Sequence, residues 1–133
     1  DEEPAAARRA FEELIGKTAM ADRWLRKHPP TVEWWGGQFA PAAIRQNHPI
    51  VKTVEEALQT ITGRTPTIQG MTYGADMRLL VNDGRIPTIL FGAGDVRKAH
   101  QFDEYVPLDE LETVVKTVAL TILEFCGITQ SKP

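Results

Sequence analysis

The residues best suited to chemistry lie together in one short segment, residues 92–104. The segment holds His100, followed closely by Asp103 and Glu104. Neutral imidazole is the commonest metal ligand in proteins, and a nearby carboxylate often orients the ring. The pattern therefore allows His100 to bind a metal ion with Glu104 or Asp103 in support. A loop histidine among solvated acidic neighbours is, however, the commoner reason for such spacing.

The glycines of this segment raise a second possibility, a nucleotide site. Gly92 and Gly94 follow an apolar run, as in the opening of a dinucleotide-binding fingerprint. The third glycine is absent, because position 97 is Arg97. No helix is expected to begin directly after Gly94 and offer its N-terminus to a pyrophosphate. We therefore do not expect nucleotide binding here.

Helical patterns flank this segment on both sides. Apolar residues recur at helical spacing over residues 4–28, 49–61 and 108–125. Asn47 or His48 is placed to cap the second of these helices. These three segments, and a shorter one over residues 75–81, are therefore expected to be helices.

Three shorter segments between the helices are expected to be strands, over residues 32–35, 66–72 and 86–91. The last is a continuous apolar run, which is typical of a strand buried on both faces. Helices alternating with buried strands predict an α/β protein. Ligands bind beyond the carboxyl ends of strands in such sheets, so we expect His100 at the rim of a sheet.

The bulk composition restricts the kind of protein. The 133 residues are 42% hydrophobic and 25% charged, which is typical of a globular domain. A net charge of −3 without a basic stripe argues against a nucleic-acid partner. No apolar stretch reaches the roughly 18 residues that a membrane span needs, so we expect no membrane and a cytoplasmic protein. Cys126 is the only cysteine, which excludes an internal disulfide.

Three stretches between residues 22 and 106 resemble the acetylornithine deacetylase and succinyl-diaminopimelate desuccinylase family, and the resemblance extends over nearly the whole chain. The first stretch holds Asp22, Trp24, Leu25, His28, Pro29, Pro30, Val32, Glu33 and Trp34. The second, residues 74–78, looks like the family's strand-to-helix turn with its Asp and Arg. The third, residues 99–106, looks like its final metal-ligand motif.

The resemblance implies the C-terminal fragment of a zinc metallopeptidase or aminoacylase. Residues 1–37 would be the last helix and strand of an α+β lid and dimerisation domain. Residues 38–133 would be the C-terminal part of a three-layer α/β catalytic domain. Both domains would be incomplete. Members of the family hold two metal ions, usually zinc, with cobalt or manganese as alternatives.

The same resemblance assigns a role to several positions of this sequence. His100 would bind one metal ion, and Tyr73 and Gly74 would lie where the backbone approaches the substrate. Met77 departs from the small residue that many relatives have. The other metal ligands and the general-base glutamate would lie upstream, so no catalytic residue is expected in this chain.

Three further polar residues are expected to support the site rather than to react. Asp76 and Arg78 would orient the substrate loop, although a capping role for Asp76 at the start of a helix is an equal alternative. Glu104 would support His100 or have a purely structural role.

The expected function is hydrolysis of an N-acyl amino acid amide or a small peptide bond by the intact protein. The partner of this chain would be the missing N-terminal part of the same polypeptide, and a homodimer is possible. The 133 residues alone would bind metal weakly and not turn over. The alternative is a non-catalytic small α/β interaction module that self-associates.

Overall fold

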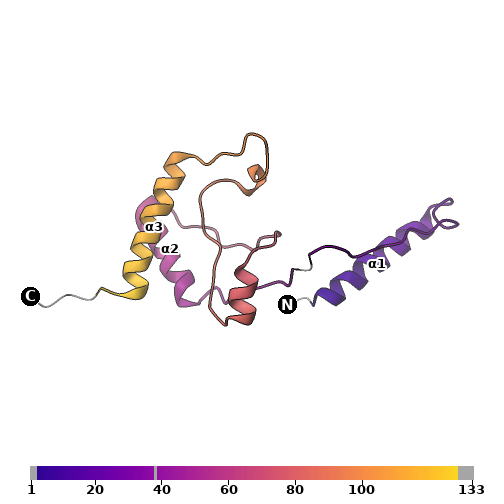
Figure 1. Ribbon diagram of the computed structural model, residues 1–133, viewed down its shortest axis with the longest axis horizontal. Coiled ribbons are helices and arrows are strands. Elements are labelled where there is room, and N and C mark those ends of the chain that lie inside the picture. The colour runs from indigo at the N-terminus through magenta and orange to yellow at the C-terminus, as the bar shows by residue number, and fades with distance from the viewer. Residues whose placement is uncertain (1–2, 38, 129–133) are drawn as a thin grey trace, which may run out of the picture. The chain divides into compact units, whose positions relative to one another are not determined.

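The computed structural model describes residues 3–37 and 39–128. Contacts divide the chain into two compact units, Asp1–Pro41 and Ala42–Pro133. The first unit contains α1 (Pro4–Ala21), and the second contains α2 (Pro49–Thr62) and α3 (Leu108–Cys126), as Figure 1 shows. Two short segments complete the second unit, the π-helical η1 (Leu79–Asp83) and the 3-10 helical η2 (Val96–Lys98). The lid and catalytic identities predicted for residues 1–37 and 38–133 stay predictions.

Helix α1 ends earlier than the sequence pattern indicates. Pro4 occupies its start, where a missing backbone N–H costs nothing. The Asp22 carboxylate accepts the backbone N–H groups of Trp24 and Leu25, both at 2.8 Å. Such bonds offer the backbone a partner outside the helix. The helix therefore stops at Ala21, and residues 22–28 form turns and a bend.

The segment after these turns packs on α1 through side chains instead of forming a strand. Trp34 donates its indole N–H to Oε1 of Glu12 at 2.6 Å. The ring of Phe11 meets Trp34 edge-on, with the ring centroids 5.8 Å apart. The Arg8 guanidinium lies 5.2 Å from the Trp34 ring centroid. The indole of Trp34 therefore joins this segment to the helix.

Helices α2 and α3 pack side by side (Figure 1) and form the core of the second unit. The buried side chains at this contact are small. They are Val51 and Ala57 on α2 and Thr117 and Thr121 on α3. His48 caps α2 by accepting the Ile50 N–H at its Nδ1, 3.2 Å away, which confirms one of the two predicted caps.

The apolar stripe of α3 does not face α2. Leu111, Val115, Val118, Ile122 and Phe125 are between 42% and 60% exposed, whereas Thr117 is fully buried. Cys126 at the end of the helix is exposed as well. Thr117 and Thr121 are thus the buried residues of α3, while most of its apolar stripe is uncovered.

The prediction of an α/β fold is wrong, because the described residues contain no β-strand. Residues 66–72 and 86–91 have no regular structure. A bend follows the first of these segments at Tyr73. Ile86, Leu90 and Phe91 are 52%, 43% and 36% exposed, so this run is not buried on both faces. A strand requires a hydrogen-bonded neighbour, which an apolar pattern does not supply. Neither a three-layer catalytic sheet nor a lid sheet is present in this part of the chain.

One further property concerns membranes. Within residues 3–37 and 39–128, no helix has the length and apolar character needed to cross a bilayer.

Candidate functional site

His100 lies in the loop of residues 92–107, which contains η2 and leads into α3, and not at the rim of a sheet. The residue is exposed, and its φ of 62° lies in the left-handed region that non-glycine residues rarely adopt. Its backbone N–H donates to Oε2 of Glu104 at 2.9 Å. The loop therefore exposes a histidine to solvent while a carboxylate holds its backbone.

A second carboxylate holds the beginning of this loop. Glu110, in the first turn of α3, accepts the backbone N–H of Gly94 at 2.8 Å. Gly94 has a φ of 91°, and a Cβ added there would lie 3.3 Å from Cγ2 of Val106. Position 94 therefore favours glycine, and the two ends of the loop lie close together.

An ion pair fixes the turn just before His100. The Asp95 carboxylate accepts the backbone N–H of Arg97 and its side-chain Nε–H, each at 2.9 Å. The hydrogen bond from the Arg97 side chain lowers the pKa of Asp95 from 3.8 to about 2. The same carboxylate raises the pKa of Arg97. Asp95 thus acts as the cap of η2, which is a structural role.

A hollow of about 600 Å³ opens beside the loop, entirely within the second unit. Tyr73 and Glu104 both line it, together with Lys98 and Tyr105. The Lys98 ammonium lies 5.8 Å from the Tyr105 ring centroid. The structure therefore brings Tyr73 and Glu104 to one cavity with a cation, a carboxylate and aromatic surface.

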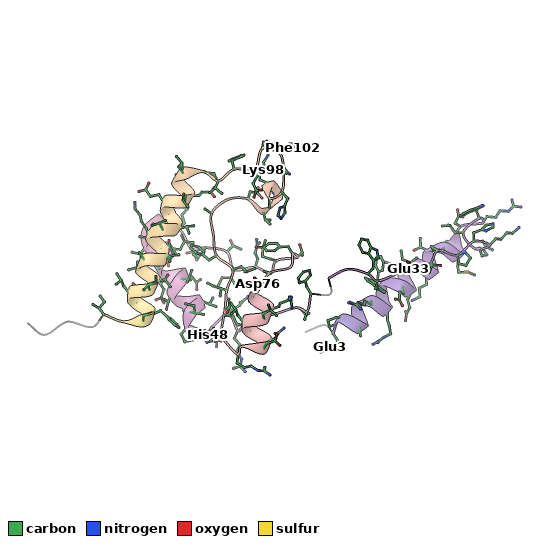
Figure 2. All side chains as sticks on the ribbon, viewed as in Figure 1. Glu3, Glu33, His48, Asp76, Lys98 and Phe102 are labelled. Atoms are coloured by element: carbon green, nitrogen blue, oxygen red, sulfur yellow. The ribbon has the colours of Figure 1, made fainter. Side chains whose placement is uncertain are left out.

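The remaining predicted site residues lie elsewhere in the second unit. Asp76 begins a helical segment, where its carbonyl accepts the N–H groups of Leu79 and Leu80 at 2.9 and 3.2 Å. Figure 2 shows Asp76 apart from Lys98 and Phe102, which lie together in the loop. Gly74, Asp76 and Arg78 do not line the hollow, and neither does His100. Their predicted roles toward a substrate or metal stay predictions.

A metal site needs several donor side chains close together. Across the described part of the chain, no group of three or more His, Cys, Asp or Glu side chains is arranged to hold a metal ion. His100 fits the role of one ligand, because it is an exposed imidazole. The described residues therefore do not form a complete metal site by themselves.

Two contacts of the loop were not anticipated from the sequence. Glu110 holds Gly94 across 16 residues, a separation for which no local spacing rule exists. Arg97 pairs with Asp95 two positions away, and this short spacing of opposite charges is a signal that the sequence does contain. The contact between the Glu110 carboxylate of α3 and the Gly94 N–H, by contrast, has no signal in the sequence.

The chain was compared with known proteins. The sequence profile described as peptidase family M20/M25/M40 matches residues 5–124. An N-formyl-4-amino-5-aminomethyl-2-methylpyrimidine deformylase of Halalkalibacterium halodurans is 31% identical over 134 residues, which covers 92% of this chain and 30% of that protein. The deformylase of the same name from Bacillus subtilis is 27% identical, over 88% of this chain and 29% of that protein.

A third relative carries a different activity in its name. An acetylornithine deacetylase of Myxococcus xanthus is 30% identical over 83 residues, which covers 62% of this chain and 20% of that protein. No solved structure gives a significant match. The chain spans about 30% of the length of the two deformylases. These findings confirm the family resemblance drawn from the sequence.

Proposed function

This chain belongs to peptidase family M20/M25/M40, and from that premise we propose that it is part of a metal-dependent hydrolase that removes a short acyl group from an amine. Three relatives support this reaction class, because two are named deformylases and one is named a deacetylase. The substrate class we propose is an N-formyl or N-acetyl amine, including N-acyl amino acids and small peptides.

The observation that carries the proposal is the state of His100. Its side chain is exposed to solvent, and its backbone is held by a carboxylate within the region that matches the family. We propose that His100 binds one metal ion, with zinc as the first candidate and cobalt or manganese as alternatives. Such ions supply a Lewis acid and an activated water for amide hydrolysis.

The other residues of the loop and hollow have binding and supporting roles in this proposal. Tyr73 lines the hollow, and with Gly74 it is proposed to contact the substrate. Asp76 and Arg78 are proposed to support the segment that carries them. The remaining ligands and the general base are proposed to come from other parts of the same polypeptide, so no catalytic residue is assigned here.

The proposal extends to the organisation of the full-length protein. Residues 38–133 are proposed to be part of the catalytic domain, and residues 1–37 part of a lid and dimerisation domain. A homodimer in the cytoplasm is the expected form. The support for this organisation is family membership.

A hydrolysis assay tests the reaction class. Full-length protein loaded with zinc is incubated with the N-formyl aminopyrimidine named for two relatives and with N-acetylornithine, and the released amine is quantified. We expect release from at least one compound, and we expect a chelator to abolish it. Absence of hydrolysis from a panel of N-formyl and N-acetyl amines, with metal bound, would contradict the proposal.

A further inference from the structure

We infer that Glu104 is a positioning residue for His100, whose carboxylate holds the histidine backbone in the conformation that presents the imidazole to a metal ion. This inference rests on the proposed function, because it concerns how the proposed ligand is held. It goes further by naming the atom that does the holding, Oε2 of Glu104.

The backbone of His100 needs an external constraint. A φ of 62° is disfavoured for a residue with a side chain, and such conformations persist only where neighbours enforce them. Within the described residues, the only other non-glycine residue with positive φ is Arg85, which lies outside the loop. Within the loop, His100 is therefore the non-glycine residue whose backbone is strained.

The Glu104 carboxylate is suited to supply that constraint. It accepts the His100 N–H at 2.9 Å, and a hydrogen bond to an ionised acceptor is stronger than one between neutral groups. The backbone N–H of Glu104 donates in turn to the carbonyl of Gln101 at 3.3 Å. Both bonds close the same short turn, so a displacement of Glu104 would release the His100 backbone.

Glu104 also connects the histidine to the hollow. Glu104 is among the residues that line the hollow of about 600 Å³, while His100 is not. A carboxylate that holds the ligand's backbone from the hollow side leaves the imidazole free of that bond. The geometry therefore separates two tasks, with Glu104 holding the backbone and His100 offering its ring.

A competing interpretation is that Glu104 itself binds the metal, and two substitutions separate the two roles. In Glu104→Gln, the amide oxygen still accepts the His100 N–H, but the charge that a ligand would use is lost. In Glu104→Ala, both are lost. A positioning residue is therefore rescued by glutamine, whereas a ligand is not.

Zinc affinity of the full-length protein provides the first readout, measured by competition with a chromophoric chelator. We expect Glu104→Ala to weaken zinc binding about 10-fold to 100-fold, as expected for partners that orient a ligand. We expect Glu104→Gln to stay within about 3-fold of wild type, since the acceptor remains. Glu112→Ala is the matched control, because Glu112 is an exposed glutamate paired with Lys116 on α3, and its affinity should be unchanged.

Amide hydrogen exchange of the metal-free protein provides a second readout that needs no metal. The His100 amide should exchange about 10-fold slower in wild type than in an unstructured peptide of the same sequence, because the bond must open first. The protection should survive in Glu104→Gln and disappear in Glu104→Ala. Should Glu104→Ala fail to fold, Glu104→Leu, which also lacks an acceptor but keeps more side-chain volume, replaces it in both measurements.

The outcomes for this inference and for the proposed function are distinguishable. If His100→Ala binds zinc as tightly as wild type, the proposed role of His100 fails, whatever the exchange data show. If His100→Ala loses zinc but Glu104→Ala keeps both wild-type affinity and wild-type exchange, the positioning role alone is overturned. Equal loss of affinity in Glu104→Gln and Glu104→Ala overturns it in favour of direct ligation.

Discussion

Among single residues, a few specific contacts hold the loop around His100. Two of them, at Asp95 and at Gly94, lead to testable predictions. The Asp95–Arg97 pair has a pH dependence whose sign follows from the lowered pKa of Asp95. The charged pair is present above pH 3.8 and is lost as the pH falls toward 2. Both groups are exposed, so the effect is local to the turn.

An NMR titration of the Asp95 carboxyl group measures this directly. We expect a midpoint at about 2 in the wild-type protein. In Arg97→Gln the midpoint should rise toward 3.8, because the largest cause of the shift is removed. A wild-type midpoint near 3.8 would show that the ion pair does not form in solution.

The second prediction concerns the stability of the protein when Gly94 is replaced. Gly94→Ala adds a Cβ at a φ of 91° and 3.3 Å from Cγ2 of Val106. We expect a loss of about 1 to 3 kcal/mol in the free energy of unfolding, measured with urea. Gly92→Ala is the control, since nothing lies within 4 Å of the added atom and its φ is not positive. Equal stability of the two variants would contradict the strained loop.

At the scale of elements, the contact between α2 and α3 depends on small side chains. Ala57 and Thr117 are both fully buried, which lets the two helices approach closely. Ala57→Leu should lower the free energy of unfolding by about 1 to 3 kcal/mol through overpacking. Ala119→Leu on the exposed part of α3 is the control and should cost little. Urea unfolding compares them, and a tolerated leucine at position 57 would show that the contact is loose.

The elements also show which parts of the fold local sequence determines. Helical periodicity and the cap at His48 predicted α2 and α3 correctly, because these signals act within one or two turns. The end of α1 depended on the Asp22 side chain, which competes with the helix for backbone N–H groups. The three predicted strands failed, because a strand depends on distant partners that a local pattern cannot reveal.

The candidate site also has some features that the sequence indicates and others that only the structure shows. The family resemblance, and not residue type and spacing alone, singled out His100 as a ligand, and the roles of His100 and Glu104 stay predictions. The contact between Glu110 and Gly94 was not predicted, because it joins a loop to a helix 16 residues away. The left-handed backbone of His100 also gave no signal in the sequence, since it arises from the fold of the loop.

At the scale of the whole molecule, exposed apolar surface is the dominant feature. The α3 stripe from Leu111 to Phe125 is uncovered, and Leu108 and Ile128 beside it are 81% and 73% exposed. Apolar patches of this kind usually mark surfaces that other protein covers. With about 30% of the relatives' length present, we propose that other parts of the same polypeptide cover it.

The proposal that His100 is one ligand among several predicts how the 133 residues behave alone. Within the described residues, no cluster of three potential metal ligands exists. We expect weak zinc binding and no turnover of N-acyl amino acids by the isolated chain, tested by calorimetry and a sensitive amine assay. Hydrolysis by the purified 133 residues would mean that the chain holds a site of its own.

The metal content of full-length protein carrying His100→Ala tests the central claim most directly. Protein is loaded with excess zinc and dialysed to remove unbound ions, and bound zinc per chain is counted by mass spectrometry. His28→Ala is the matched control, because His28 is exposed and stacks on Trp24 in the other unit. We predict about two zinc ions per chain in wild type and in His28→Ala, and at least one fewer in His100→Ala. Equal zinc in all three proteins would contradict the claim that His100 is a metal ligand.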